Sequence, residues 1–267
     1  MADRSYNFDG GTLPSVFKKL RTDTELVTDR SLSGSYSVYF GGGDNSPFFQ
    51  WIEPEMEEPG GVSLESIQVH LQETSNSSGT GFKVYNENGE VLAGMATENP
   101  GWVVFQGGGN GNTTSLNGGS QYDVWLRFKM SFDWANEQVT YEFEDLGNGN
   151  TASLTQPFEH PGSGITMAAL DDNNFGAGTS DTWLDDVQLT FAPAFTIEGT
   201  ITEDGTAVAA PVYLLDADFN KLAGKNSATD GTYSFRRAYR GLQYYVLTAV
   251  SGRRPLVHGP FDEPAQS

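Results

Sequence analysis

The chain has 267 residues, a formal net charge of −20 and no cysteine. The missing cysteines exclude disulfides, thiolate zinc sites and cysteine nucleophiles. The length suggests one large or two ordinary domains, and no run approaches the roughly 18 apolar residues of a membrane span.

The acidity is concentrated in one part of the chain. Residues 1–192 carry eight lysines and arginines against 27 acidic residues, whereas residues 193–267 carry seven against eight. Such an acidic surface repels nucleic acid and anionic membranes. It suits solubility at high salt, where ions screen the self-repulsion. The charge therefore favours a halophilic source, with an ordinary acidic protein as the alternative.

Short strand patterns separated by turns fill the first part of the chain. In the segment 32–40, Tyr36, Val38 and Phe40 lie on one face of a predicted strand. Asn88-Gly89 is a hairpin signal between two such segments. Residues 5–11 are predicted to form a short strand and a turn. The other predicted strands cover 48–52, 66–71, 82–85, 91–93, 102–105, 122–128, 138–143, 165–170 and 182–191, and residues 107–119 are expected to form a loop. Spaced strands of this kind indicate a jelly-roll β-sandwich.

A second strand pattern starts after Ala192-Pro193-Ala194. Proline cannot donate to a sheet ladder, so this segment is a plausible place for one sheet to end. Further strands are predicted at 195–201, 212–215 and 244–250, and residues 230–235 are predicted to be a turn that enters a strand. We therefore expect an all-β protein with domains at 1–192 and 193–267.

Two resemblances follow from these patterns. The order FDGG, SGSYSVYF, YDVWLRF, VTYEFE and WLDDVQLT is similar to concanavalin A-like jelly rolls, including laminin-G-like and carbohydrate-binding modules. The order IEGTITEDGTAVAAPVYLL, DGTYSF and YYVLTAV resembles the carboxypeptidase-regulatory-like, transthyretin-like β-sandwich. The first resemblance implies sugar binding, and the second implies an appended stalk or docking domain.

The first resemblance also implies a structural calcium ion that joins the two ends of the domain. The matching positions are Asp9, the backbone from Ser33 to Ser35, and Asp185 or Asp186. Calcium takes six to eight hard oxygen ligands, which carboxylates and carbonyls supply. The alternative is that Asp9 caps a turn and the aspartate pair is partly solvated.

Sugar binding requires an aromatic face beside polar side chains. Trp134 lies in a polar turn with Asp133 and Asn136, so it is the tryptophan expected at the surface. Trp102, Trp125 and Trp183 are expected in the core, because aromatic side chains supply much of the area that a sandwich buries.

Catalysis is not expected. Glu142 and Glu144 share one face of a predicted strand, but they lack a third acid in the spacing E-x-D-x-x-E. The three histidines are scattered and lack zinc-binding spacing. Five arginines, at 236, 237, 240, 253 and 254, cluster in the second domain. They form either a face for an acidic partner or a solvated surface.

These features favour a non-enzymatic structural protein on the surface or tail of a virion, assembled from several copies. The first residues, MADRSYNFDGG, lack the apolar segment of a secretory signal, and a virion protein is made inside a cell but works outside it. The expected partners are other copies, virion proteins and a host-surface glycan. The alternatives are an exported carbohydrate-binding protein whose signal was trimmed, and a glycan-degrading enzyme with an accessory module.

Overall fold

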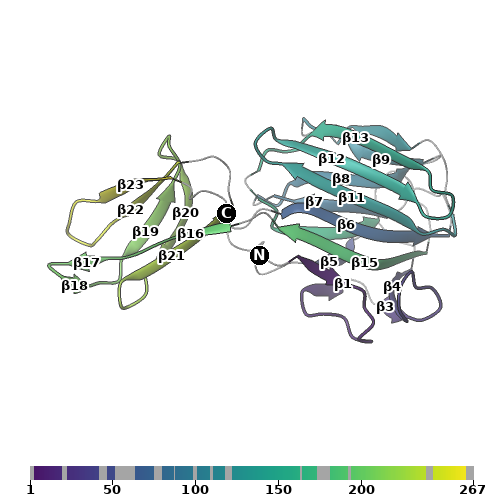
Figure 1. Ribbon diagram of the computed structural model, residues 1–267, viewed down its shortest axis with the longest axis horizontal. Helices are drawn as coiled ribbons and strands as arrows, with labels where there is room; N and C mark the ends of the chain where they lie inside the picture. Colours follow the sequence, from purple (N-terminus) through teal and green to yellow (C-terminus); the bar gives the residue numbers. More distant parts are fainter. Residues whose placement is uncertain are drawn as a thin grey trace. The chain divides into compact units, whose positions relative to one another are not determined.

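A computed structural model describes residues 3–19, 23–41, 47–51, 64–74, 80–86, 88–98, 101–108, 111–117, 122–162, 164–172, 181–191, 194–238 and 243–262. Every regular element within these ranges is a β-strand, as predicted (Figure 1). Among them, no helix is long and apolar enough to cross a membrane. The chain divides into two compact units, one within residues 2–191 and the other from residue 192 onward.

The first unit is a sandwich of two antiparallel sheets, which confirms the predicted jelly-roll architecture. One sheet has the order β13-β12-β11-β6-β15-β4-β3, with β1 also paired to β15; the other has the order β10-β9-β8-β7-β14-β5-β2. The eight-stranded sheet contains β1 (Arg4–Tyr6), β3 (Thr24–Val27), β4 (Ser37–Phe40), β6 (Leu64–Glu73), β11 (Leu126–Asp133), β12 (Gln138–Asp145), β13 (Thr151–Pro157) and β15 (Thr182–Phe191). The seven-stranded sheet contains β2 (Phe17–Lys19), β5 (Pro47–Trp51), β7 (Thr80–Tyr85), β8 (Val91–Glu98), β9 (Gly101–Phe105), β10 (Thr113–Asn117) and β14 (Met167–Asp172).

Alternating side chains from both sheets fill the space between them. In β11 and β12, every second residue is buried, as a half-buried strand requires. The rings of Trp102 and Phe128, from opposite sheets, lie 4.1 Å apart between centroids. The backbone N–H of Gly94 donates to the buried hydroxyl of Tyr141, 3.2 Å away, which adds a polar link between the sheets.

The second unit is a smaller set of antiparallel sheets. Its core is formed by side chains such as Phe195, Ile197, Val212, Phe235 and Tyr244. One sheet has the order β20-β19-β22-β23, and two further pairs are β16 with β21 and β17 with β18. The strands are β16 (Ala194–Thr200), β17 (Thr202–Glu203), β18 (Thr206–Ala207), β19 (Pro211–Leu215), β20 (Lys221–Asn226), β21 (Thr232–Ala238), β22 (Gln243–Thr248) and β23 (Leu256–Asp262).

Two sequence-based strand assignments need correction. The predicted strand at 32–40 begins only at Ser37, because the preceding backbone turns at Gly34, which has a φ of 59°. The predicted strand at 122–128 begins only at Leu126, since Asp123 has a φ of 54°. Such positive φ values interrupt extended backbone. The expected loop at 107–119 also contains a strand, β10, which pairs with β9.

Candidate functional site

Strand β15 changes its neighbour at the Asp185-Asp186 pair. Before the pair, Thr182, Trp183 and Leu184 lie opposite β4; after it, Val187 to Leu189 lie opposite β1. On its other side, β15 has a bulge against β6 between Asp185 and Gln188. Asp186 has a φ of 46°, a left-handed conformation that fits a bulge. The pair therefore occupies a gap between two neighbouring strands.

In this gap, the carboxylate of Asp185 accepts three backbone hydrogen bonds. Its Oδ2 accepts the backbone N–H groups of Leu32 and Ser33 at 2.9 and 3.1 Å, and its Oδ1 accepts the N–H of Asp186 at 2.8 Å. The side chain is fully buried. Burial raises the pKa of Asp185 to about 6, although the hydrogen bonds favour the charged form and oppose that rise.

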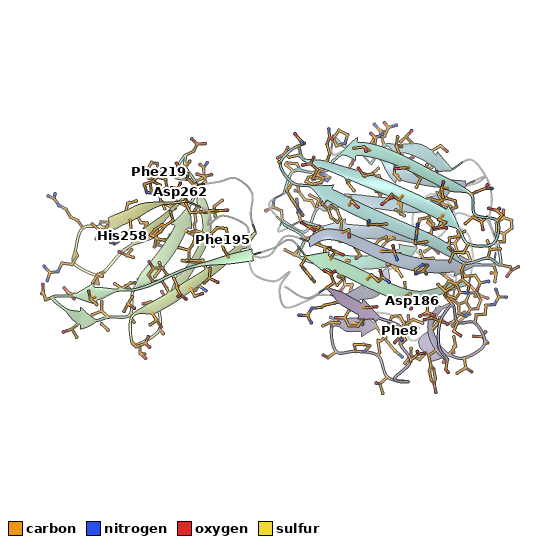
Figure 2. All side chains as sticks on the ribbon, viewed as in Figure 1. Phe8, Asp186, Phe195, Phe219, His258 and Asp262 are labelled. Atoms are coloured by element: carbon orange, nitrogen blue, oxygen red, sulfur yellow. The ribbon has the colours of Figure 1, made fainter. Side chains whose placement is uncertain are left out.

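Asp186 and Asp9 extend the same network along the loop of residues 31–36. The hydroxyl of Ser33 donates to Oδ1 of Asp186 at 2.7 Å, and the N–H of Ser35 donates to Oδ1 of Asp9 at 2.7 Å. Figure 2 labels Asp186 and Phe8 in this corner of the first unit. A Cβ added to Gly34 would lie 1.7 Å from Oδ1 of Asp9, so the loop requires glycine there. These contacts join the two ends of the first unit.

The five residues that the sequence predicted as a calcium site thus lie together, but they contact one another through hydrogen bonds. The partners of the three carboxylates are N–H and O–H donors, whereas calcium requires several oxygen atoms directed at one point. Among the described residues, no group of three His, Cys, Asp or Glu side chains is placed to share a metal ion. Calcium at this position stays a prediction.

Residues that the sequence did not single out surround the network. The guanidinium of Arg30 lies 4.4 Å from the ring centroid of Trp183 and forms an ion pair with Asp123 at 2.7 Å. The hydroxyl of Tyr39 donates to Asp181 at 2.9 Å, and burial together with this bond raises the pKa of Tyr39 to about 12. Tyr39 could have been found from its place on the polar face of its strand, but no sequence signal marks Arg30.

Trp134 lies in the turn between β11 and β12, where the sequence predicted a surface tryptophan. Its side chain is half-buried, and its indole N–H donates to the backbone carbonyl of Leu64 at 2.9 Å. The ring stacks on Phe132 at a centroid distance of 5.7 Å and an interplanar angle of 29°, with the ring of Phe158 edge-on at 5.3 Å. These contacts fix the orientation of the indole while part of it stays at the surface.

Asp133 and Asn136 lie beside Trp134 and bind each other. The side-chain amide of Asn136 donates to Oδ2 of Asp133 at 2.7 Å, and its backbone N–H donates to Oδ1 at 3.1 Å. These bonds lower the pKa of Asp133. Both side chains are exposed, so the turn that carries Trp134 also presents a carboxylate and an amide at the surface.

The other candidates from the sequence have structural partners. Glu144 pairs with Arg127 at 2.5 Å, and Glu142 pairs with Lys129 at 3.5 Å across neighbouring strands. Each acid therefore faces a cation of the same sheet. Trp102 and Trp183 are 2% and 4% exposed and belong to the interior, whereas Trp125 is only half-buried.

The arginines of the second unit differ in whether they form ion pairs. Arg253 binds Glu203 at 2.7 Å and Asp204 at 3.4 Å. Arg254 is exposed and has no hydrogen-bond or ion-pair partner among the described residues. The side chains at 236 and 237, and the whole of residue 240, lie outside the described part of the chain.

Comparison with solved structures aligns this chain with lectins and a CBM2 module. Lectin II from Ulex europaeus aligns with a TM-score of 0.46 and 9% identity, over 70% of this chain and 98% of that chain. Arcelin-5, a lectin-like defense protein from Phaseolus vulgaris, aligns with a TM-score of 0.48 and 6% identity, over 71% and 97%. The CBM2 module of the evolved Dit of Lactobacillus casei BL23 phage J-1 aligns with a TM-score of 0.44 and 13% identity, over 72% and 98%. No protein-family model and no curated protein matches the sequence.

Proposed function

We propose that the protein is a non-enzymatic glycan-binding protein and that its first unit holds a sugar ring against Trp134. The observation that carries this proposal is the orientation of the indole. Leu64, Phe132 and Phe158 fix the ring on three sides, while the side chain is only half-buried. A fixed aromatic side chain loses little conformational entropy on binding, which favours affinity.

The neighbouring polar groups complete the proposed subsite. Asp133 supplies carboxylate oxygens that can accept from sugar hydroxyls, and Asn136 adds an amide. Their mutual hydrogen bonds hold both groups in place before a ligand arrives. An apolar ring face beside a few positioned polar groups is the usual composition of a small-molecule site.

Substitution of Trp134 by alanine is expected to weaken glycan binding at least about tenfold, because the ring would contribute as an interface hot spot. Wild type and variant should be compared on a panel of neutral and acidic oligosaccharides. Trp134→Phe keeps an aromatic ring and should retain most of the binding. Leu146→Ala, at the opposite end of β12 and 40% exposed, is the matched control. Equal binding by wild type and W134A, with both folded, would contradict the proposed site.

More specifically, we propose that the protein is a surface or tail appendage of the virion of a virus that infects a halophilic host. It would be present in several copies. The support is the order of an acidic unit followed by a near-neutral one. The acidic unit would face the host glycan, and the second unit would contact virion proteins. Purified particles should contain the chain at a fixed copy number. Its absence from particles, together with export by the producing cell, would favour the alternative of a cell-surface or secreted carbohydrate-binding protein.

A further inference from the structure

The second unit contains a cavity of about 430 Å³ that the proposed function does not use. Its walls come from the ends of β16 and β22, from β17, β21 and β23, and from the turn at residues 250–254. A volume of this size lies within the range of small-molecule sites. His258, one of its lining residues, is labelled on β23 in Figure 2.

A glycine allows an aromatic ring to form one wall. Gly199 of β16 lies directly opposite Tyr233 of β21. A Cβ at Gly199 would lie 2.6 Å from the Tyr233 hydroxyl oxygen, so the ring lies across the glycine. Tyr233 is half-buried, and its hydroxyl has no hydrogen-bond partner among the described residues. The hydroxyl is therefore available to a ligand in the cavity.

The ionisable side chains that line the cavity differ in whether they have an ion-pair partner. Glu203 and Arg253 both line it, but they neutralise each other through an ion pair of 2.7 Å. Arg254 and His258 also line it, and neither side chain has a hydrogen-bond or ion-pair partner in the described part of the chain. A guanidinium with an unused donor pair fits a carboxylate with two parallel hydrogen bonds. The cavity thus favours an anion.

The remaining walls combine apolar and hydroxyl groups. Leu256, which lines the cavity, is 56% exposed and presents an apolar side chain to it. Phe261 and Val250 add apolar area, whereas Thr200 and Thr248 add hydroxyls. A ligand that matches these walls has an apolar face, several hydroxyls and one carboxylate.

We propose that this cavity binds a hexuronate, a sugar acid, with its carboxylate on Arg254 and His258. The C–H face of the sugar would pack on Leu256, and the Tyr233 hydroxyl would bond to a ring hydroxyl. The site is separate from the one proposed at Trp134, since it lies wholly in the second unit.

The test is a calorimetric titration of the full chain with glucuronate and with glucose. We expect saturable binding of glucuronate and at least about tenfold weaker binding of glucose, because glucose lacks the carboxylate. Arg254→Ala should weaken glucuronate binding at least about tenfold, and His258→Ala should weaken it to a smaller extent. Lys221→Ala removes an equal charge from another exposed position of the second unit and should leave binding unchanged.

Three outcomes would overturn the proposal: no saturable binding of glucuronate, equal affinity for glucose, or unchanged affinity in Arg254→Ala. W134A separates this site from the first one, because it should keep the glucuronate affinity of the wild type. Loss of glucuronate binding in W134A, with Arg254→Ala unaffected, would place the sugar acid in the first unit.

Discussion

Substitution of Asp185 by alanine is expected to lower the free energy of unfolding of the first unit by about 3 kcal/mol. The carboxylate accepts three backbone N–H groups in a buried gap between strands, and alanine would leave those donors without a partner. An unsatisfied buried donor costs roughly 1–3 kcal/mol, and such costs do not add fully. Asp185 is therefore expected to stabilise the first unit substantially through its side chain.

Urea unfolding followed by tryptophan fluorescence measures this effect in the intact chain. All five tryptophans lie before residue 192, so the signal reports on the first unit alone. Glu65→Ala is the matched control, since it also removes one negative charge but from an exposed position of β6. Equal unfolding midpoints for Asp185→Ala and Glu65→Ala would show that the network does not stabilise the unit.

Between pH 4 and pH 6, the stability of the wild type is expected to fall relative to Asp185→Asn as the pH rises. The pKa of Asp185 is raised from its ordinary value of 3.8 to about 6 in the folded chain. In this window the folded state therefore holds a proton that the unfolded state has lost, and ionisation at higher pH removes that advantage. For these two pKa values, the expected loss of stability between pH 4 and pH 6 is about 2 kcal/mol.

The difference between the two proteins isolates this titration, because asparagine does not ionise. Unfolding should be measured at closely spaced pH values, again by tryptophan fluorescence. The carboxylates with lowered pKa values, such as Asp133, affect both proteins alike and cancel in the difference. A difference that is flat, or that rises with pH, would contradict the assignment of a raised pKa to Asp185.

The strands that alternate cleanly were predictable from the sequence. The segment 182–191 forms β15 with the expected bounds, and Asn88-Gly89 lies in the turn between β7 and β8. β13 was missed because its sequence, TASLTQP, is largely polar. It lies at the edge of its sheet, where burial alternates only between exposed and half-buried positions. An edge strand of this kind carries a weak hydrophobic pattern.

The sequence identified the acidic residues of the first candidate site, but it did not identify the groups that donate hydrogen bonds to them. The Asp185-Asp186 pair drew attention as two acids in an apolar strand. The donors of Leu32 and Ser33 could not be anticipated, because the extended pattern from residue 32 concealed the turn at Gly34. A backbone N–H also has no side-chain signature. The sequence therefore identified the carboxylates but not the backbone donors that they accept from in the structure.

The prediction of the site at Trp134 depended less on contacts between distant parts of the chain. A tryptophan among polar turn residues indicates partial exposure from the sequence alone. What the sequence could not provide is the fixed orientation, which comes from Leu64 and Phe158, far away in the chain. By contrast, the cavity lined by Arg254 could not be predicted from the sequence. Its walls come from five strands and a turn, so no local pattern reveals it.

The most direct test of glycan binding in the first unit follows the indole N–H signals of the five tryptophans by NMR during titration with an oligosaccharide that binds. We predict that the signal of Trp134, assigned through its loss in Trp134→Phe, shifts progressively and saturates. The signals of the buried Trp102 and Trp183 should stay nearly unchanged. A saturating shift confined to other tryptophans, with the Trp134 signal fixed, would contradict the proposed site.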